Sequence, residues 1–115
     1  MSEPYANIEV SREEVDRWTG AVVVNFGTNW CGYCRAAEPF VEEALQMHPS
    51  VRQVKVEDGK GRRLGRSFGV KLWPTLVFMR DGVEVARVVR PIDATQVSQA
   101  LVKIDPAPVT PSSET

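Results

Sequence analysis

The spacing of two cysteines is the feature of this sequence that most limits what it can fold into. Cys31 and Cys34 are the only cysteines of the chain, and they stand between two segments of different periodicity. Residues 21–26 form a continuous apolar and mostly β-branched run, which predicts a strand buried on both faces. Apolar residues then recur at helical spacing, and they are Ala37, Phe40, Val41, Ala44 and Leu45. The cysteine pair is therefore predicted to open a helix directly after a buried strand.

The rest of the chain continues this alternation of strands and helices. Ser11 followed by Glu14 is typical of a helix N-terminus, and Asp93 marks another. Asp81-Gly82 between two apolar runs favours a β-hairpin. The predicted elements are strands at 8–10, 21–26, 51–57, 76–80 and 83–89, and helices at 11–20, 31–48, 60–68 and 94–104. Their order predicts an α/β fold with parallel early strands and an antiparallel hairpin at the sheet edge.

Length and charge limit the organisation and the partners of the chain. Its 115 residues suit one domain, which we expect at 8–104, after a flexible N-terminus at 1–7 and before a disordered tail at 105–115. A net charge of −1 gives no overall field for nucleic acid or an anionic membrane, so neither is expected as a partner. Because no signal-peptide pattern or membrane-length apolar run is present, we expect a cytoplasmic protein.

Redox exchange is the chemistry that the cysteine pair favours over its other uses. A zinc site needs more ligands than two cysteines and His48 supply, so no metal is expected. A c-type haem needs a histidine after the second cysteine, where Arg35 stands. A structural disulfide that closes so short a loop stabilises little. We therefore interpret Cys31 and Cys34 as a redox-active disulfide and expect no bound cofactor.

The place of the pair on the first turn of a helix gives each sulfur a role. The i, i+3 spacing puts the sulfurs near enough to close a disulfide. Unpaired backbone N–H groups at the helix start favour a thiolate at Cys31, and we expect a lowered pKa that makes Cys31 the nucleophile. Cys34 lies one turn deeper, so we expect it to resolve the mixed disulfide.

Several motifs in the same order give residues 8–104 a resemblance to the thioredoxin family. They are the strand at 22–26, the segment Trp30-Cys-Gly-Tyr-Cys34, Pro39, the segment 68–75 (FGVKLWPT) and Asp81-Gly82. The resemblance implies a thioredoxin fold, a three-layer α/β/α arrangement with a central mixed sheet of about five strands and four helices. It also implies a monomeric protein-disulfide reductase that acts on protein disulfides and receives electrons from a thioredoxin reductase-like, NADPH-dependent flavoprotein.

The resemblance further implies a substrate groove beside the cysteines. Pro74 is expected to be cis and to face the first cysteine, and Pro74 and Thr75 are expected to present backbone to an extended substrate segment. Trp30 is expected to shape the groove rim. Trp73 stands where the family usually has a smaller aliphatic residue, and Arg90 where many members have a glycine. Both could narrow the choice of substrate or further lower the pKa of Cys31, and the alternative is that Trp73 is partly core and Arg90 is solvated.

The residues between the cysteines are expected to tune the redox potential. Gly32 matches the motif of the family, whereas Tyr33 takes the place of its proline. The N–H of Tyr33 adds a donor near the Cys31 sulfur, which favours the reduced form and a potential more oxidising than the about −270 mV of thioredoxin. An oxidase or isomerase-like role is therefore an alternative to reduction. A partner-specific binding or escort module is a further alternative.

A buried position before the motif also departs from the family. Asn25 replaces an aspartate that many thioredoxins carry, and Gln53 is aligned with the lysine that partners it. A carboxylate there can take the proton of Cys34, whereas Asn25 cannot titrate. We therefore expect Asn25 to alter the redox chemistry, and water or an acid such as Glu57 to accept that proton; the alternative is that Asn25 only satisfies a buried polar position.

Overall fold

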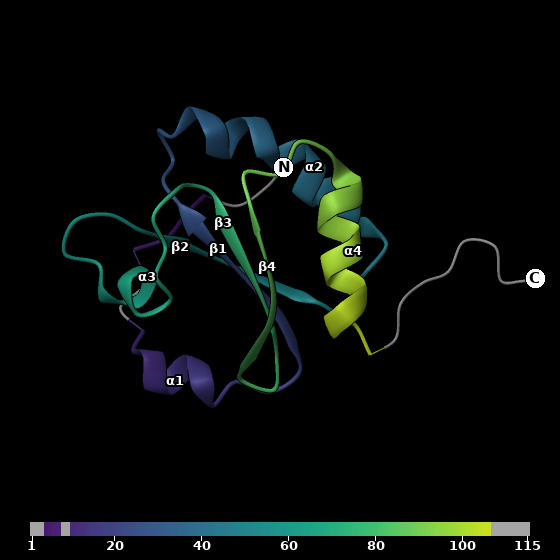
Figure 1. The fold of residues 1–115 in the computed structure, drawn as a ribbon, viewed down its shortest axis with the longest axis horizontal. Helices are drawn as coiled ribbons and strands as arrows, with labels where there is room; N and C mark the ends of the chain where they lie inside the picture. Colours follow the sequence, from purple (N-terminus) through teal and green to yellow (C-terminus); the bar gives the residue numbers. More distant parts are fainter. Residues whose placement is uncertain (1–3, 8–9, 107–115) are drawn as a thin grey trace, which may run out of the picture.

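A four-stranded mixed sheet forms the centre of the molecule. The computed structural model describes residues 4–7 and 10–106, and its strands follow the order β2-β1-β3-β4 (Figure 1). The strands are β1 (Ala21–Gly27), β2 (Arg52–Glu57), β3 (Thr75–Arg80) and β4 (Val83–Val89). β1 pairs in parallel with β2 and antiparallel with β3, which also pairs antiparallel with β4. The predicted parallel pairing of the early strands and the predicted hairpin are both confirmed.

The sheet of the described residues has four strands, whereas about five were expected. The difference lies at residues 8–10, because Ile8 and Glu9 fall outside the described residues and Val10 is in no strand. Ala6 instead forms an isolated parallel bridge with Val56 of β2, held by two backbone hydrogen bonds. A single bridging residue attaches this segment to the sheet without extending it.

Four helices of the described residues complete a three-layer α/β/α arrangement. α2 (Gly32–Gln46) and α4 (Ala94–Ile104) cover one face of the sheet, and α1 (Arg12–Asp16) and α3 (Arg63–Ser67) cover the other (Figure 1). α1 and α3 are shorter than predicted, with five residues each. At α3 the physical reason is backbone geometry, because Gly59 and Gly61 have φ values of +137° and +82°, which a helix does not allow.

The predicted caps and turn are present and fix where these elements begin and end. Ser11 Oγ accepts the backbone N–H of Glu14 at 3.1 Å, and the side chain of Asp93 caps α4 in the same way. Asp81 and Gly82 have φ values of +52° and +81°, the left-handed conformations that a two-residue hairpin requires. Local sequence therefore controls most element boundaries.

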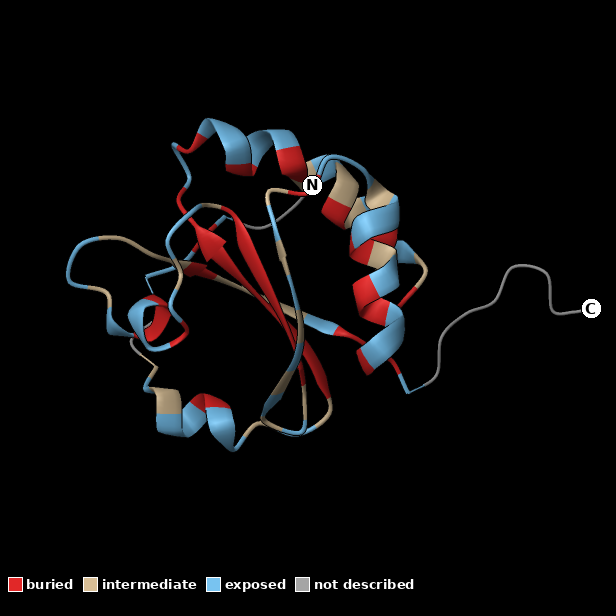
Figure 2. Cartoon of the chain, in the orientation of Figure 1, coloured by how far each residue is buried: buried red, intermediate tan, exposed pale blue. Residues whose placement is uncertain are grey.

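The core lies on both sides of β1 and β3, whose residues are almost all buried (Figure 2). On one face these strands pack against α2 and α4 through side chains that include Val23, Leu76, Phe78, Val41, Val97 and Leu101. On the other face they pack against α1 and α3 through side chains that include Val24, Phe26, Val77, Val15, Leu64 and Phe68. Truncating such a side chain costs on the order of 3 kcal/mol. This packing on both faces holds β1 in place, and β1 in turn supports the residues that follow it.

Both ends of the described chain are part of the fold. Tyr5, which the sequence places in a flexible segment, is 8% exposed and packs against the two cysteines. Asp105, the first residue of the expected tail, is also buried, and its carboxylate lies 2.6 Å from His48 Nδ1. Each residue is held by specific polar partners that lie far away in the sequence, which composition does not reveal. Residues 1–3 and 107–115 of the two expected flexible ends lie outside the described residues.

Candidate active site

Cys31 and Cys34 lie at the start of α2, directly beyond the loop that follows β1. Cys31 is the N-cap of α2, and its Sγ accepts the backbone N–H of Cys34 at 3.2 Å. Both thiols are free and buried, with Cys34 at 3% exposure and Cys31 at 7%. The predicted junction of a buried strand and a helix therefore holds a reduced cysteine pair, and Cys34 is the deeper of the two.

The environment of Cys34 disfavours its ionisation. Burial is the larger cause, and a hydrogen bond to the Cys31 sulfur adds to it, so that the pKa of Cys34 is raised to about 11. Interactions with the backbone of Thr28 and with the side chain of Tyr5 act in the opposite direction and lower the pKa of Cys34. Burial also raises the pKa of Tyr5 far above its usual range, so the phenol stays protonated.

The loop before β3 lies beside this pair. The Trp73–Pro74 peptide bond is cis, as the resemblance implies, and Pro74 and Cys34 line one cavity. Arg90 holds the loop with two hydrogen bonds, from its backbone N–H to Pro74 O at 3.0 Å and from its Nε to Trp73 O at 2.8 Å. Arg90 reaches both carbonyls with a φ of +51°, an uncommon conformation for a residue other than glycine.

Aromatic side chains gather around the cysteine pair. Trp30 is 70% exposed and meets Trp73 edge to face, with ring centroids 5.7 Å apart. Tyr33 is 60% exposed, and the Arg90 guanidinium lies 3.7 Å from the centre of its ring. Trp73 is fixed by its Nε1, which donates to Asp58 Oδ2 at 2.9 Å. The structure thus joins four residues that the sequence singles out separately.

Gly32 and Thr75 contribute to this region in different ways. Gly32 is exposed, and a Cβ added there would meet no atom within 4 Å, so the space above the motif is open. Thr75 is 1% exposed, and its hydroxyl donates to Leu72 O at 2.6 Å. The side chain of Thr75 is therefore turned away from solvent, and only its backbone can take part in a substrate contact.

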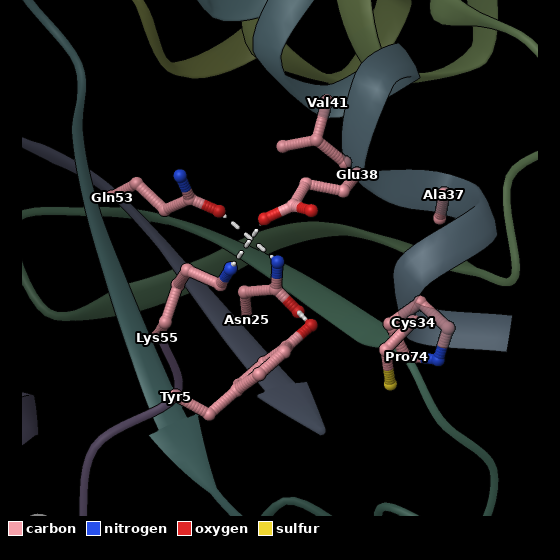
Figure 3. Close-up of a pocket in the computed structure, with 9 residues that line it drawn as sticks. All are labelled: Tyr5, Asn25, Cys34, Ala37, Glu38, Val41, Gln53, Lys55 and Pro74. Atoms are coloured by element: carbon pink, nitrogen blue, oxygen red, sulfur yellow. Dashed lines mark hydrogen bonds and ion pairs between the residues drawn. The ribbon is translucent and has the colours of Figure 1, made fainter. Parts of the chain in front are cut away.

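A cluster of polar side chains lies behind Cys34 (Figure 3). The Tyr5 hydroxyl donates to Asn25 Oδ1 at 2.8 Å, and Asn25 Nδ2 donates to Gln53 Oε1 at 3.0 Å. Lys55 Nζ lies 3.3 Å from Glu38 Oε2 and 4.4 Å from the centre of the Tyr5 ring. The cavity between these groups measures about 10 Å³, room for no more than one water molecule. The pairing of Asn25 with Gln53 is the neutral one that the sequence predicts.

Glu57 is not part of this cluster, although it was a candidate acid in the sequence. Its carboxylate lies 3.0 Å from Arg62 Nη2, and it lines a separate cavity of about 430 Å³ with Arg62 and Arg63. Glu57 ends the strand, and its pairing with Arg62 turns it toward α3. The acid that lines the cavities beside Cys34 is Glu38, one helical turn further along α2.

Three residues of the cluster were not predicted from the sequence as site residues, namely Tyr5, Glu38 and Lys55. Tyr5 lies in a segment without periodicity, and no pattern marks it. The alternation in β2 does carry a signal, because Gln53 and Lys55 share a face of the strand and β2 was expected to lie beside β1. Spacing likewise places Glu38 one turn after Cys34, on the same face of the helix.

The described residues also bear on metal binding and on membrane insertion. Residues 4–7 and 10–106 contain no group of three or more His, Cys, Asp or Glu side chains that could hold a metal ion. Within the same part of the chain, no helix is long and apolar enough to cross a membrane.

Comparisons with known proteins agree with one another. The family model described as Thioredoxin matches residues 7–103. The chain is 34% identical over 83 residues to thioredoxin 1 of Nostoc sp., a match that covers 71% of this chain and 78% of that protein. It is 32% identical over 93 residues to thioredoxin 1 of Synechococcus elongatus, with 80% and 87% covered. The solved structure of reduced thioredoxin 2 from Pseudomonas aeruginosa is similar at 53% identity and a TM-score of 0.82, with 90% and 96% covered.

Proposed function

The chain belongs to the thioredoxin family and is a protein thiol–disulfide oxidoreductase, and on this premise we propose that it reduces protein disulfides with Cys31 as the attacking thiol and Cys34 as the resolving thiol. The observation that carries the proposal is the arrangement of the reduced pair. The Cys31 sulfur caps α2 and accepts the N–H of Cys34, whereas Cys34 is deeper and its pKa is raised. A donor at the first sulfur and burial at the second suit attack followed by resolution.

The reaction proceeds in two exchanges of a disulfide bond. The Cys31 thiolate attacks one sulfur of the substrate disulfide, which forms a mixed disulfide and releases the other substrate sulfur as a thiolate. Cys34 then loses its proton and attacks the Cys31 sulfur. The Cys31–Cys34 disulfide forms, and the second substrate thiolate leaves and takes a proton from solvent. The substrate gains two electrons, and the cysteine pair loses them.

The substrate-binding surface proposed for this reaction is formed by Trp30, Trp73, Pro74, Thr75 and Arg90. The exposed ring of Trp30 against Trp73 supports a groove rim, and the burial of the Thr75 side chain supports Thr75 as a backbone contact only. Arg90 bonds both carbonyls of the Trp73–Pro74 loop while its guanidinium stays over Tyr33. We infer that Arg90 holds the loop and favours substrates with a carboxylate beside the reactive disulfide.

Tyr33 supports an oxidase or isomerase-like role as the second candidate. The sequence predicts the Tyr33 N–H as a donor to the Cys31 sulfur, whereas the donor in the structure is the Cys34 N–H. Tyr33 instead holds a cation 3.7 Å from its ring centre. We infer that Tyr33 and Gly32 tune the potential of the pair, with Tyr33 acting through Arg90, because a positive charge beside a thiolate stabilises the reduced form.

The electron source and the setting of the protein are also proposed. An NADPH-dependent flavoprotein reductase would return the Cys31–Cys34 disulfide to the dithiol, so no cofactor bound to this chain is required. The two cysteines both belong to the redox pair and leave none for a structural disulfide, which suits a reducing compartment, and we infer a cytoplasmic monomer. Light scattering of the purified protein tests the monomer, and coupled NADPH oxidation with a purified thioredoxin reductase tests the donor.

Reduction of insulin in the presence of dithiothreitol tests the proposed direction. We expect the chain to accelerate the precipitation of insulin B chains well above dithiothreitol alone. Cys31→Ser should abolish that acceleration, and Cys34→Ser should leave a covalent mixed disulfide with the substrate. A chain that gives no acceleration contradicts the reductase. An escort module would keep its partner binding in Cys31→Ser, and an oxidase would have a potential well above that of thioredoxin.

A further inference from the structure

Cys34 must lose a proton before it can attack, and its surroundings oppose that loss. It is 3% exposed, and burial is the main reason that its pKa is raised. Asn25 stands where a carboxylate would accept the proton, and an amide has no basic site for it. Glu57 faces Arg62 in another cavity. A group that stabilises the Cys34 thiolate must therefore be another neighbour of its sulfur.

Tyr5 is one of the side chains packed against that sulfur. The side chains of Tyr5 and Cys34 both close over Gly27. A Cβ built on Gly27 would lie 2.6 Å from Cys34 Sγ and 2.9 Å from the Tyr5 hydroxyl oxygen. Asn29 fixes the backbone of Tyr5 on both sides, because its Oδ1 accepts Tyr5 N–H at 2.8 Å and its Nδ2 donates to Tyr5 O at 3.1 Å.

The Tyr5 hydroxyl has one proton and two neighbours that can accept it. In the dithiol form the hydroxyl donates to Asn25 Oδ1 at 2.8 Å. A neutral thiol is a weak acceptor, whereas a thiolate is a strong one, so ionisation of Cys34 changes which acceptor is better. Because burial keeps the phenol protonated, Tyr5 remains a donor wherever Cys34 titrates.

The other charged or titratable groups around Cys34 come from its own helix and from β2. Those that line the adjoining cavities or contact the sulfur are Cys31, Arg35, Glu38 and Lys55. Glu38 and Lys55 are paired with each other, so their charges offset in this cavity. Cys31 is neutral once it is part of a mixed disulfide, so its contribution to the raised pKa of Cys34 disappears in that intermediate. Tyr5 is then the side-chain donor that opposes burial.

We propose that the Tyr5 hydroxyl turns from Asn25 Oδ1 to the Cys34 sulfur when Cys34 ionises, and so stabilises the thiolate that resolves the mixed disulfide. The inference rests on the proposed role of Cys34 as the resolving thiol. The Cys34 S–H bond breaks, and its proton goes to solvent through a cavity of about 180 Å³ that Cys34 and Tyr5 line and that reaches exposed Asn29 and Arg35. The thiolate then attacks Cys31, the new disulfide forms, and the substrate leaves as a thiolate.

Tyr5→Phe tests this role because it removes the hydroxyl and keeps the ring. Oxidation of the reduced protein by dithiobis(nitrobenzoate) under stopped flow releases one thiol when Cys31 attacks and a second when Cys34 resolves. Loss of one charge-assisted hydrogen bond should move the midpoint of the second phase up by about one pH unit. The thiolate fraction of Cys34 then falls about tenfold at neutral pH. The remaining thiolate is about threefold more nucleophilic because its pKa is higher, so the rate of the second phase falls about threefold.

The pH profile separates this role from packing alone. Above the midpoint both proteins are ionised, and the second phase of Tyr5→Phe should become the faster one by about threefold. The first phase should change less than twofold at every pH. Val15→Ala, which creates a cavity in the core on the α1 face, is the matched control. It should lose stability without moving the pH midpoint of the second phase. Equal slowing of both phases, or an unmoved midpoint, overturns the proposal.

A second variant covers the case in which Tyr5→Phe does not fold. Difluorotyrosine at position 5 keeps the shape of the side chain and makes the phenol a stronger donor, so the midpoint should fall below that of the parent protein. A midpoint that stays or rises contradicts the proposal. Cys34→Ser should lack the second phase altogether, and a second phase that persists in it shows that the roles of the cysteines, rather than that of Tyr5, are wrongly assigned.

Discussion

Replacing Gly27 by alanine puts a methyl group where the structure has no room for one. The added Cβ would lie 2.6 Å from Cys34 Sγ, 2.8 Å from Tyr5 Cζ and 2.9 Å from the Tyr5 hydroxyl oxygen. Gly27 lies outside the left-handed region, so the backbone tolerates alanine and the clash is the cost. Overpacking of this kind costs about 1–3 kcal/mol, against a total stability of about 5–15 kcal/mol for a typical domain. We expect Gly27→Ala to lose about 2 kcal/mol of unfolding free energy.

Urea unfolding of the reduced protein, followed by circular dichroism, measures this loss. Gly32→Ala is the matched control, because a Cβ there meets no atom within 4 Å and the residue lies in the first turn of α2. An alanine should stabilise that helix by up to about 0.5–1 kcal/mol. The two substitutions add the same methyl group, so their difference isolates the packing of Tyr5 and Cys34 over β1.

A double-mutant cycle identifies the atoms responsible. In the Tyr5→Ala background two of the three close contacts are absent, so Gly27→Ala should cost less there than in the parent protein. The reasoning is refuted if Gly27→Ala is as stable as the parent protein. It is also refuted if the two substitutions are additive, because Tyr5 would then not lie against this glycine.

Four further outcomes are expected. Folded Cys34 keeps its proton to about pH 11, whereas an unfolded thiol ionises near pH 9. The reduced protein should therefore lose stability as the pH rises from about 9 to about 11. In urea titrations over this range, Cys34→Ala should lose less stability than the parent protein. Asp105→Ala leaves the buried His48 without its partner at 2.6 Å and should lower the free energy of unfolding by about 3 kcal/mol, measured by urea unfolding. An unchanged urea midpoint would show that the pair is dispensable. Arg90→Gln should raise KM for peptide disulfides flanked by carboxylates and leave KM for neutral ones nearly unchanged, which steady-state kinetics on paired peptides can decide. Tyr33→Pro removes the ring beneath Arg90 and should make the potential more reducing in a glutathione titration, and a potential that rises contradicts the tuning role.

Local signals explain most of what could be predicted about the fold. The caps at Ser11 and Asp93, the hairpin at Asp81-Gly82 and the buried run of β1 depend on neighbouring residues, and the structure has each of them. The lengths of α1 and α3 could not be predicted as well, and Val10, which was expected in a strand, lies in none. Helix propensity says little about how far a short helix continues when glycines and tertiary contacts end it.

In the candidate site, too, local features could be predicted and long-range contacts could not. Cys31 and Cys34 could be found because three residues of spacing at the start of a helix already bring two sulfurs together. The neutral pairing of Asn25 with Gln53 was predicted from the resemblance to thioredoxins. The contact of Arg90 with Tyr33 was not predicted, because it joins a loop and a helix that are far apart in the chain.

By itself the sequence determined a redox pair at a strand–helix junction in an α/β domain. Those features follow from periodicity, caps and spacing, which act over a few residues. Only the tertiary structure decided what surrounds the pair. It brings Tyr5 from the N-terminal segment and Lys55 from β2 against Cys34, and it turns Glu57 away toward Arg62. The physical reason is that burial, hydrogen bonding and charge act through space, so the chemistry of the second thiol depends on residues that no local pattern connects to it.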